Sequence, residues 1–395
     1  NHSCTTALLP IATKVAIGFN DAKPARRSAL CAVDLSKAFD CIDHTLLLAQ
    51  ISSTDLHPNI IRWLASYIRG RTARCLYGSS LSNQMIIRSG VPQGSVLSPA
   101  LFNFFVSDCP GNVDDLAAYA DDITAVKSDP VLSVLGDKLQ EAVTPIVEWA
   151  DRKKLNIAPS KSQVTLFTPW NQQFNYRPAV SIKGVDIPLC RTPKILGVTF
   201  DTMFTFSHHV AAIASKALQR LKIMKAVSGS LWGHDKETLF ITYRALIESV
   251  FNFAAPVWWP NCKPTNAAKL QRIQNAALRL ITGCHLAASI DHLHAETKLM
   301  PVAEHLNMLC SQFLAKCLSP SHPSHDVVLQ SPGPRSNNQG RPMKETLSSK
   351  FLDTVSPFLQ NGVIPASTYN RTKDSIHTNA VRSYLASTEP NPVLG

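Results

Sequence analysis

The sequence predicts an α+β fold in which a part built from strands and helices precedes an all-helical part. Up to about residue 205, apolar runs of strand length alternate with helical stretches and turn residues. Over residues 206–317, apolar residues instead recur every three to four positions, the period of helices buried along one face. Two of the strand-length runs lead directly into aspartates, at Asp34 and at Asp121-Asp122. These strand ends are therefore where we look for chemistry.

The strands and helices are expected in a definite order. Strands are predicted at residues 30–34, 72–77, 84–88, 116–120, 123–126, 164–167, 180–182, 185–187 and 195–200. Helices are predicted at residues 6–19, 43–51, 58–70, 101–106 and 130–154, then repeatedly between residues 206 and 317, and weakly at residues 348–358. Asp43 is a suitable N-cap for its helix, and Pro58 suits a first helical turn.

Composition narrows the class of protein. A chain of 395 residues with 45% hydrophobic content can bury the cores of two or three subdomains. Its net charge of +11 favours a polyanionic partner, and nucleic acid is the first candidate. No run of 18 apolar residues exists, so we expect no transmembrane helix and no membrane partner. The ten scattered cysteines predict reduced thiols in an intracellular compartment.

Three features have both a plain and a functional interpretation. An Asp-Asp pair alone is most often a solvated turn, but a third aspartate on a neighbouring strand end would complete a site for hard divalent cations. The loop at residues 89–99 contains two glycines and two prolines and precedes a helix, so it is either a simple connection or a phosphate cradle. The basic residues of the helical part form either a solvated face or a groove for a phosphate backbone; they are Lys216, Arg220, Lys222, Lys225, Arg244, Lys263, Lys269, Arg272 and Arg279.

Three segments, in this order and with this spacing, resemble the motifs of reverse transcriptases. AVDLSKAFD at residues 32–40 resembles motif A, SGVPQGSVLSP at residues 89–99 resembles motif B, and YADD at residues 119–122 resembles motif C. Details of motifs A and C, and the segment around Gly197, resemble the enzymes of non-LTR retrotransposons. Three ordered motifs are far more specific than any one of them.

This resemblance implies a right-hand polymerase fold. The palm would be an antiparallel sheet with helices, accompanied by partial fingers and followed by an all-helical thumb and connection. The implied bounds are a fingers remnant at residues 1–28, the palm with fingers elements at 29–205, the thumb and connection at 206–317, and a Pro/Ser-rich, poorly ordered C-terminal region at 318–395. The chain would then begin inside the fingers and be truncated at its N-terminus.

The resemblance also implies a role for individual residues. Asp34, Asp121 and Asp122 would hold two Mg²⁺ ions, with Mn²⁺ as the alternative metal. Lys161 would be the motif D lysine that approaches the pyrophosphate, although a solvated loop lysine is the other interpretation. Residues of the nucleotide pocket would be Leu35, Ser36, Phe39, Gln93 and Gly94, and residues of the primer grip would be Leu196 and Gly197.

The implied activity is that of an RNA-directed DNA polymerase of a non-LTR retrotransposon. It would transfer nucleotides from dNTPs to a primer 3′-hydroxyl on an RNA template, as an intracellular ribonucleoprotein of cytoplasm and nucleus. Its partners would be the RNA template, a DNA primer or target, and dNTPs; the oligomeric state is unknown. One alternative is an RNA-directed RNA polymerase, against which Phe39 argues because a bulky ring there would clash with a ribose 2′-hydroxyl. The other is a catalytically incompetent nucleic-acid-binding remnant.

Overall fold

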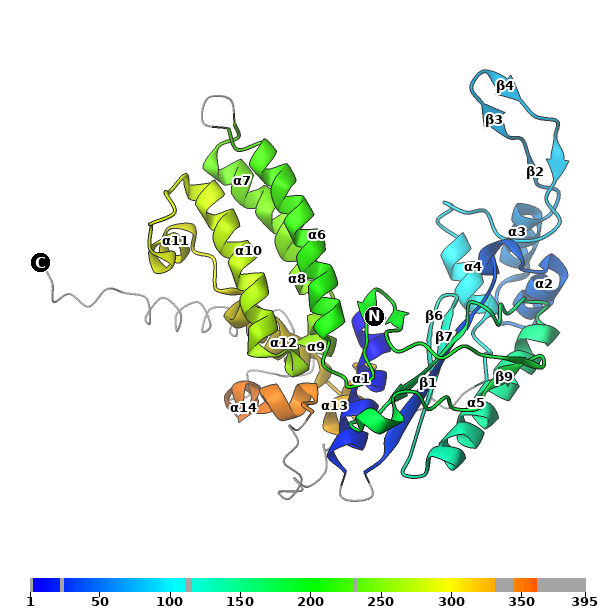
Figure 1. Ribbon diagram of the computed structural model, residues 1–395. Helices are drawn as coiled ribbons and strands as arrows, with labels where there is room; N and C mark the ends of the chain where they lie inside the picture. Colours follow the sequence, from blue (N-terminus) through cyan, green and yellow to red (C-terminus); the bar gives the residue numbers. More distant parts are fainter. Residues whose placement is uncertain (1–2, 22–24, 111–115, 230–232, 331–343, 361–395) are drawn as a thin grey trace, which may run out of the picture. The chain divides into compact units, whose positions relative to one another are not determined.

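The computed structural model describes residues 3–21, 25–110, 116–229, 233–330 and 344–360 (Figure 1). Over these residues the fold is mixed helix and sheet, as the sequence predicts. The chain divides into two compact units. We call Ser28–Leu166 with Asn175–Cys190 the sheet unit, and we call Asn1–Arg27, Phe167–Phe174 and Arg191–Gly395 the helical unit.

A four-stranded sheet forms the centre of the sheet unit. Its strands lie in the order β6-β7-β1-β8, with the bounds Leu116–Tyr119 for β6, Asp122–Asp129 for β7, Arg27–Asp34 for β1 and Gln163–Phe167 for β8. Strand β1 lies between two other strands, and most of its residues are buried. Such a strand must be apolar along most of its length, which the run at residues 29–33 provides.

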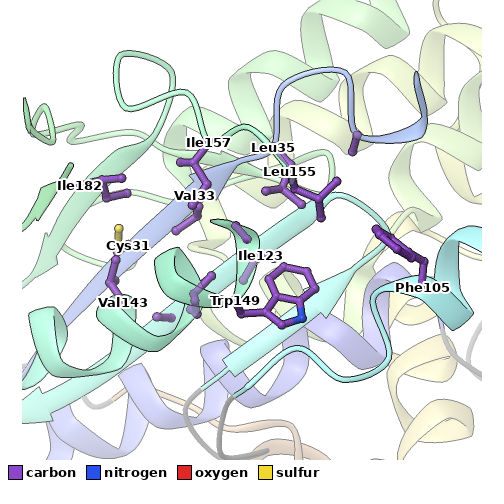
Figure 2. Packing of buried hydrophobic residues seen from close by; sticks show 14 of the residues in the cluster. Cys31, Val33, Leu35, Phe105, Ile123, Val143, Trp149, Leu155, Ile157 and Ile182 are labelled. Carbon is purple, nitrogen blue, oxygen red and sulfur yellow. The ribbon is translucent and has the colours of Figure 1, made fainter. Parts of the chain in front are cut away.

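Helix α5 (Leu132–Arg152) packs against β7 and closes the hydrophobic core of this unit. Its buried residues recur at intervals of three and four, which is why the sequence predicted an amphipathic helix here; they include Leu135, Leu139, Val143, Ile146 and Trp149. Figure 2 shows Val143 and Trp149 in the same cluster as Cys31 of β1 and Ile123 of β7. Fully burying one such apolar side chain stabilises the fold by about 1.5–3 kcal/mol.

The chain between β1 and β6 supplies three α-helices, one 3₁₀ helix and an arm of short strands. The helical elements are η1 (Ala38–Asp40), α2 (His44–Ser52), α3 (Pro58–Ile68) and α4 (Ser98–Phe105). The arm is exposed and consists of β2 (Thr72–Ala73), β3 (Leu76–Tyr77), β4 (Ser80–Leu81) and β5 (Met85–Ile86). The predicted N-cap is confirmed, because Asp43 Oδ1 accepts from the N–H groups of Thr45 (2.9 Å) and Leu46 (3.0 Å). The predicted hairpin after α5 is also present, as β9 (Ser181–Ile182) paired with β10 (Val185–Asp186).

The helical unit contains most of the helices, as the 3.6-residue period predicts. Their bounds are α1 (Cys4–Asn20), η2 (Asn171–Gln173), α6 (Ser207–Ala226), α7 (Lys236–Tyr243), the π-helical η3 (Arg244–Glu248), α8 (Ser249–Asn252), α9 (Ala255–Trp258), η4 (Trp259–Asn261), α10 (Pro264–Thr282), α11 (Ile290–Thr297), α12 (Val302–Cys317), α13 (His325–Leu329) and α14 (Leu347–Gln360). Among the described residues, no helix is long and apolar enough to cross a bilayer.

The unit boundaries differ from the bounds that the resemblance implied. Helix α1 packs against α9 and α13, so residues 1–27 group with the helical unit and not with the sheet. The helical unit also resumes at residue 191, before the expected position 206. The reason is a cluster of aromatic rings in which Phe204 lies 6.2 Å from Phe167, 6.2 Å from Phe200 and 4.8 Å from Phe206, measured between ring centroids. These ring contacts pack the segments that carry the four phenylalanines against one another, so both segments belong to the helical unit.

Part of the C-terminal region expected to be poorly ordered is folded. Helices α13 and α14 both pack against α12, and Val328, Leu347 and Val355 are buried. Helix α14 matches the weak helix predicted at residues 348–358, whereas the Ser/Pro-rich composition before Val328 gave no indication of α13. The remaining positions of that region, 331–343 and 361–395, lie outside the described residues.

A pair of reciprocal hydrogen bonds joins the folded part of this region to α1. Asn20 Nδ2 donates to the carbonyl of Lys344 (2.7 Å), and the N–H of Lys344 donates to Asn20 Oδ1 (2.9 Å). The two ends of the described chain therefore belong to one packed unit.

Candidate active site

The YADD segment forms the turn between β6 and β7. Tyr119 pairs with Asp122 in the antiparallel register, so the two turn residues are Ala120 and Asp121. We expected the two aspartates to form the turn, but Asp122 is the first residue of β7. Ala120 instead takes a left-handed conformation (φ 54°), as the first position of the tightest β-hairpins requires. Asp121 and Asp122 are both exposed at this end of the hairpin.

The three predicted carboxylates come within electrostatic range of one another. Asp34 ends β1, which is the neighbour of β7 in the sheet. Although Asp122 is exposed, the protein behind the hairpin partly desolvates its carboxyl, and this burial raises its pKa. The negative charges of Asp121 and then Asp34 raise the pKa of Asp122 further. A carboxyl with two such neighbours is stabilised by gaining either a proton or a cation.

This set of carboxylates fits a hard divalent cation. Carboxylate oxygens are the ligands that Mg²⁺ and Mn²⁺ prefer, and a cation would offset the repulsion felt at Asp122. Within the described part of the chain, no three His, Cys, Asp or Glu side chains are already arranged as metal ligands. The Cys and His residues between positions 310 and 325 are likewise not arranged as metal ligands, and their spacing matches no standard zinc knuckle. Like charges repel, so a cation's own charge would have to draw the three carboxylates of the sheet together.

A loop at residues 156–162 is hydrogen-bonded to both backbone groups of Asp34. The N–H of Asp34 donates to Ser162 Oγ (3.1 Å), and the N–H of Ala158 donates to the carbonyl of Asp34 (2.9 Å). Ser162 Oγ in turn donates to the carbonyl of Ala158 (2.9 Å), so one hydroxyl links both sides of the loop. The loop thereby fixes the end of β1, from which the Asp34 carboxylate projects.

Lys161 belongs to this loop. Its N–H donates to the carbonyl of Ala158 (3.1 Å), and its neighbour Ser162 is the residue bonded to Asp34. The Lys161 side chain is exposed. The fold therefore places the backbone of Lys161 beside the strand end that carries Asp34, with a side chain free of the core.

The glycine- and proline-containing loop lies along η1. The N–H of Val91 donates to the carbonyl of Phe39 (2.9 Å), and Gln93 Nε2 donates to Asp40 Oδ1 (2.8 Å). Gly90 has φ 85°, and a Cβ atom there would lie 2.8 Å from both the Cα and the carbonyl oxygen of Asp40. Only glycine allows this approach. Segments that resemble motifs A and B thus form one connected structure.

The predicted nucleotide-pocket residues have different environments. The ring of Phe39 is half-buried and stacks on Phe102, with ring centroids 4.2 Å apart and planes 18° apart. Leu35 is buried in the core, so its side chain is not available to a ligand. Ser36 is half-buried, and Gly94 is exposed with φ 84°.

The predicted primer-grip residues form the turn of a separate hairpin in the helical unit. Strand β11 (Lys194–Ile195) pairs with β12 (Val198–Thr199), and Leu196 and Gly197 are the two turn residues. Leu196 is half-buried and Gly197 is exposed.

The expected basic face of the helical part is only partly exposed. Arg220 and Arg279 are half-buried, and both guanidinium groups donate to backbone carbonyls, those of Leu246 (2.6 Å) and Asn275 (3.3 Å) respectively. They contribute to helix packing. The other seven predicted basic residues are exposed: Lys216, Lys222, Lys225, Arg244, Lys263, Lys269 and Arg272.

Three residues that position the site were missed from the sequence. Ser162 holds the backbone of Asp34, Asp40 holds the Gln93 amide, and His44 Nε2 donates to the carbonyl of Gly90 (2.7 Å). No spacing rule marks such partners, because they are brought together by folding. Asp40 alone carried a signal, since it ends the segment that resembles motif A.

A comparison with protein families indicates the same class of protein as the three motif segments. Residues 7–200 match the family model of reverse transcriptases, the RNA-dependent DNA polymerases. This part of the chain belongs to that family, and the resemblance stated from the three segments is confirmed.

Named relatives come from insect transposable elements. The chain is 30% identical over 292 residues to a probable RNA-directed DNA polymerase from transposon X-element of Drosophila melanogaster, covering 71% of this chain and 31% of that protein. It is 28% identical over 316 residues to the corresponding protein of transposon BS of the same species, covering 74% of this chain and 34% of the relative. It is 25% identical over 303 residues to the RNA-directed DNA polymerase from mobile element jockey of Drosophila funebris, covering 74% and 32%. The chain spans about a third of the length of these relatives.

Among solved structures, a telomerase from Candida tropicalis, in complex with a fragment of telomeric RNA, is similar at 12% identity with a TM-score of 0.39. The match covers 83% of this chain and 52% of that chain. A likeness at this level adds nothing to the assignment.

Proposed function

We propose that this chain acts as the RNA-directed DNA polymerase of a non-LTR retrotransposon. The observation that carries the proposal is the convergence of Asp34, Asp121 and Asp122, whose charges act on one another within a reverse transcriptase domain. In the right-hand description, the sheet unit would be the palm with parts of the fingers. The helices from α6 onward would be the thumb and connection.

Asp34, Asp121 and Asp122 would hold the two divalent ions, Mg²⁺ or Mn²⁺. When bound, such ions lower the pKa of a primer 3′-hydroxyl and neutralise charge on a triphosphate. The role of the chain itself is to hold three carboxylates at adjacent strand ends. Its core, and the loop at residues 156–162, keep those strand ends in place.

The reaction forms one bond and breaks one bond. The primer 3′-hydroxyl loses its proton to solvent water as its oxygen attacks the α-phosphorus of the dNTP, the bond from that phosphorus to the bridging oxygen breaks, and pyrophosphate leaves. The leaving pyrophosphate gains a proton, and we assign the donation to the ammonium group of Lys161. Support comes from its exposed side chain and from the loop that ties its backbone to Asp34.

Phe39 would select the sugar of the incoming nucleotide. Stacking on Phe102 restrains the ring, while half-burial leaves part of it accessible. A rigid ring under the sugar would clash with a 2′-hydroxyl, which favours dNTPs and argues against an RNA-directed RNA polymerase. Gln93, fixed by Asp40, and Gly94 would contact the nucleotide and template.

Primer extension tests the proposal. We would supply a DNA primer on an RNA template with Mg²⁺ and dNTPs, and compare the parent chain with Asp121→Asn. The variant should lose extension because a charged metal ligand is removed. It should keep its affinity for the RNA–DNA hybrid, which does not depend on that carboxylate. Retained extension by Asp121→Asn would refute the metal assignment. Hybrid binding without extension by either protein would favour the non-catalytic remnant.

A further inference from the structure

The hairpin formed by β11 and β12 is held in a conformation that its own sequence does not favour. Its turn residues Leu196 and Gly197 both have positive φ, 44° and 85°. Such mirror-image turns prefer Asn-Gly, and a leucine in the left-handed region is strained. Local strain of this kind persists only where the surroundings enforce it. The contacts around the hairpin therefore show what holds it.

His209 of α6 holds one strand of the hairpin. The N–H of Phe200 donates to the carbonyl of Pro193 (2.9 Å), so the preceding N–H, that of Thr199, points away from the partner strand. That N–H donates to Nδ1 of His209 (3.3 Å). The histidine side chain is buried, and burial, aided by the charge of Lys194, lowers its pKa to about 4. The ring is therefore neutral near pH 7 and remains an acceptor.

A second contact is made by the turn itself. A Cβ atom on Gly197 would lie 2.9 Å from Cε1 of Phe253, so the turn rests directly on that ring. Phe253 follows α8 and precedes Ala254, where the chain bends with φ 49°. The indole N–H of Trp258 donates to the carbonyl of Phe253 (3.0 Å), which fixes this bend.

The two contacts are joined through one side chain. Trp258 is fully buried, and its ring lies edge-on to the ring of His209, with centroids 5.4 Å apart. His209, Trp258 and Phe253 thus make a continuous support under Thr199 and Gly197. We call these three residues the hairpin support.

We propose that the hairpin support positions the Leu196-Gly197 turn for binding of a primer 3′ end, and that His209, Trp258 and Phe253 are positioning residues for the polymerase. The inference rests on the proposed function and on the resemblance to reverse transcriptases, which implies that this turn is the primer grip. None of the three residues is assigned contact with the reacting atoms. Loss of the support should therefore weaken primer placement more than binding of template RNA.

Two substitutions of His209 separate its roles. His209→Phe keeps a ring against Trp258 and removes the acceptor for Thr199. His209→Asn shortens the side chain but keeps an acceptor oxygen close to the position of Nδ1. Affinities would be measured by fluorescence anisotropy on two probes, an RNA–DNA hybrid with a recessed primer 3′ end and the same RNA alone. Thermal unfolding would be recorded for each protein.

We expect His209→Phe to weaken hybrid binding about tenfold, as loss of a single buried acceptor would. Its affinity for RNA alone should stay within about twofold, and His209→Asn should restore most of the hybrid affinity. Equal losses on both probes would overturn the proposal, as would a loss for His209→Asn as large as that for His209→Phe. A parent chain that binds the hybrid no better than RNA would also overturn it. Asp121→Asn, which affects chemistry and not binding, keeps failure of this inference distinct from failure of the proposed activity.

Discussion

The hydroxyl of Ser162 offers a direct test of how the site is positioned. It is the acceptor for the N–H of Asp34 and the donor to the carbonyl of Ala158, and the side chain is buried. Ser162→Ala removes both bonds without adding volume. The substitution leaves the backbone N–H of Asp34 without this acceptor at the end of β1, whereas the carbonyl of Ala158 still accepts from two backbone N–H groups.

The expected cost follows from the desolvation of that N–H group. Leaving buried polar groups unsatisfied costs about 1–3 kcal/mol. For a unit of this size, each kcal/mol lowers the unfolding midpoint by about 2–4 °C, so a fall of about 2–12 °C is expected. Because Asp34 would no longer be held, kcat for primer extension should fall by about 10- to 100-fold, the effect of a displacement of about 1 Å.

Ser160→Ala is the matched control. Ser160 lies in the same loop and is exposed, so its substitution should change stability by no more than about 0.5 kcal/mol. Urea unfolding and single-turnover extension would be measured for both variants. Identical behaviour of Ser162→Ala and Ser160→Ala would refute the argument that the loop at residues 156–162 holds Asp34.

Three further predictions concern the sheet unit. Gly90→Ala should destabilise it by at least about 3 kcal/mol, because a positive φ and a backbone contact at 2.8 Å oppose the new Cβ. Gly94 has a similar φ and no atom within 4 Å of an added Cβ, so Gly94→Ala should cost only about 1–2 kcal/mol. Equal urea midpoints for the two variants would contradict this. Asp122→Asn should abolish extension yet slightly raise the unfolding temperature at pH 7. Because the pKa of Asp122 is raised, the folded parent chain loses stability as pH rises through that pKa. The gain in unfolding temperature for Asp122→Asn should therefore vanish below about pH 4. A gain that does not depend on pH would contradict the raised pKa as its cause. Phe39→Val should increase incorporation of ribonucleotides relative to deoxynucleotides by about tenfold or more in competition assays, and unchanged discrimination would remove Phe39 as the sugar selector.

The sequence predicted those parts of the fold that depend on local pattern. The apolar run before Asp34, the N-cap at Asp43 and the long helix around Val143 follow from residue type and spacing alone, and all three are present. The three segments also indicated the carboxylates of Asp34, Asp121 and Asp122, whose charges act on one another in the structure. The pattern did not predict the register of the hairpin between β6 and β7. This register places Asp122 in β7 and Ala120 in the turn.

Contacts made across long stretches of sequence escaped prediction. Ser162 is an ordinary loop serine until folding places its hydroxyl against the backbone of Asp34. Arg220 looked like part of a solvated basic face, because nothing local indicates that its guanidinium reaches the carbonyl of Leu246. Val355 lies in the helix weakly predicted at residues 348–358, but nothing local indicates that it is buried where α14 packs against α12.

The bonds between Asn20 and Lys344 set an order of events during synthesis. The two residues are 324 positions apart, and the whole sheet unit is encoded between them. A ribosome therefore completes the sheet unit while α1 still lacks the later helices it packs against. Closing so large a loop carries an entropy cost that only the finished helical unit can offset. The nascent chain must keep the apolar face of α1 from aggregating until then, so chaperone dependence should be concentrated at α1.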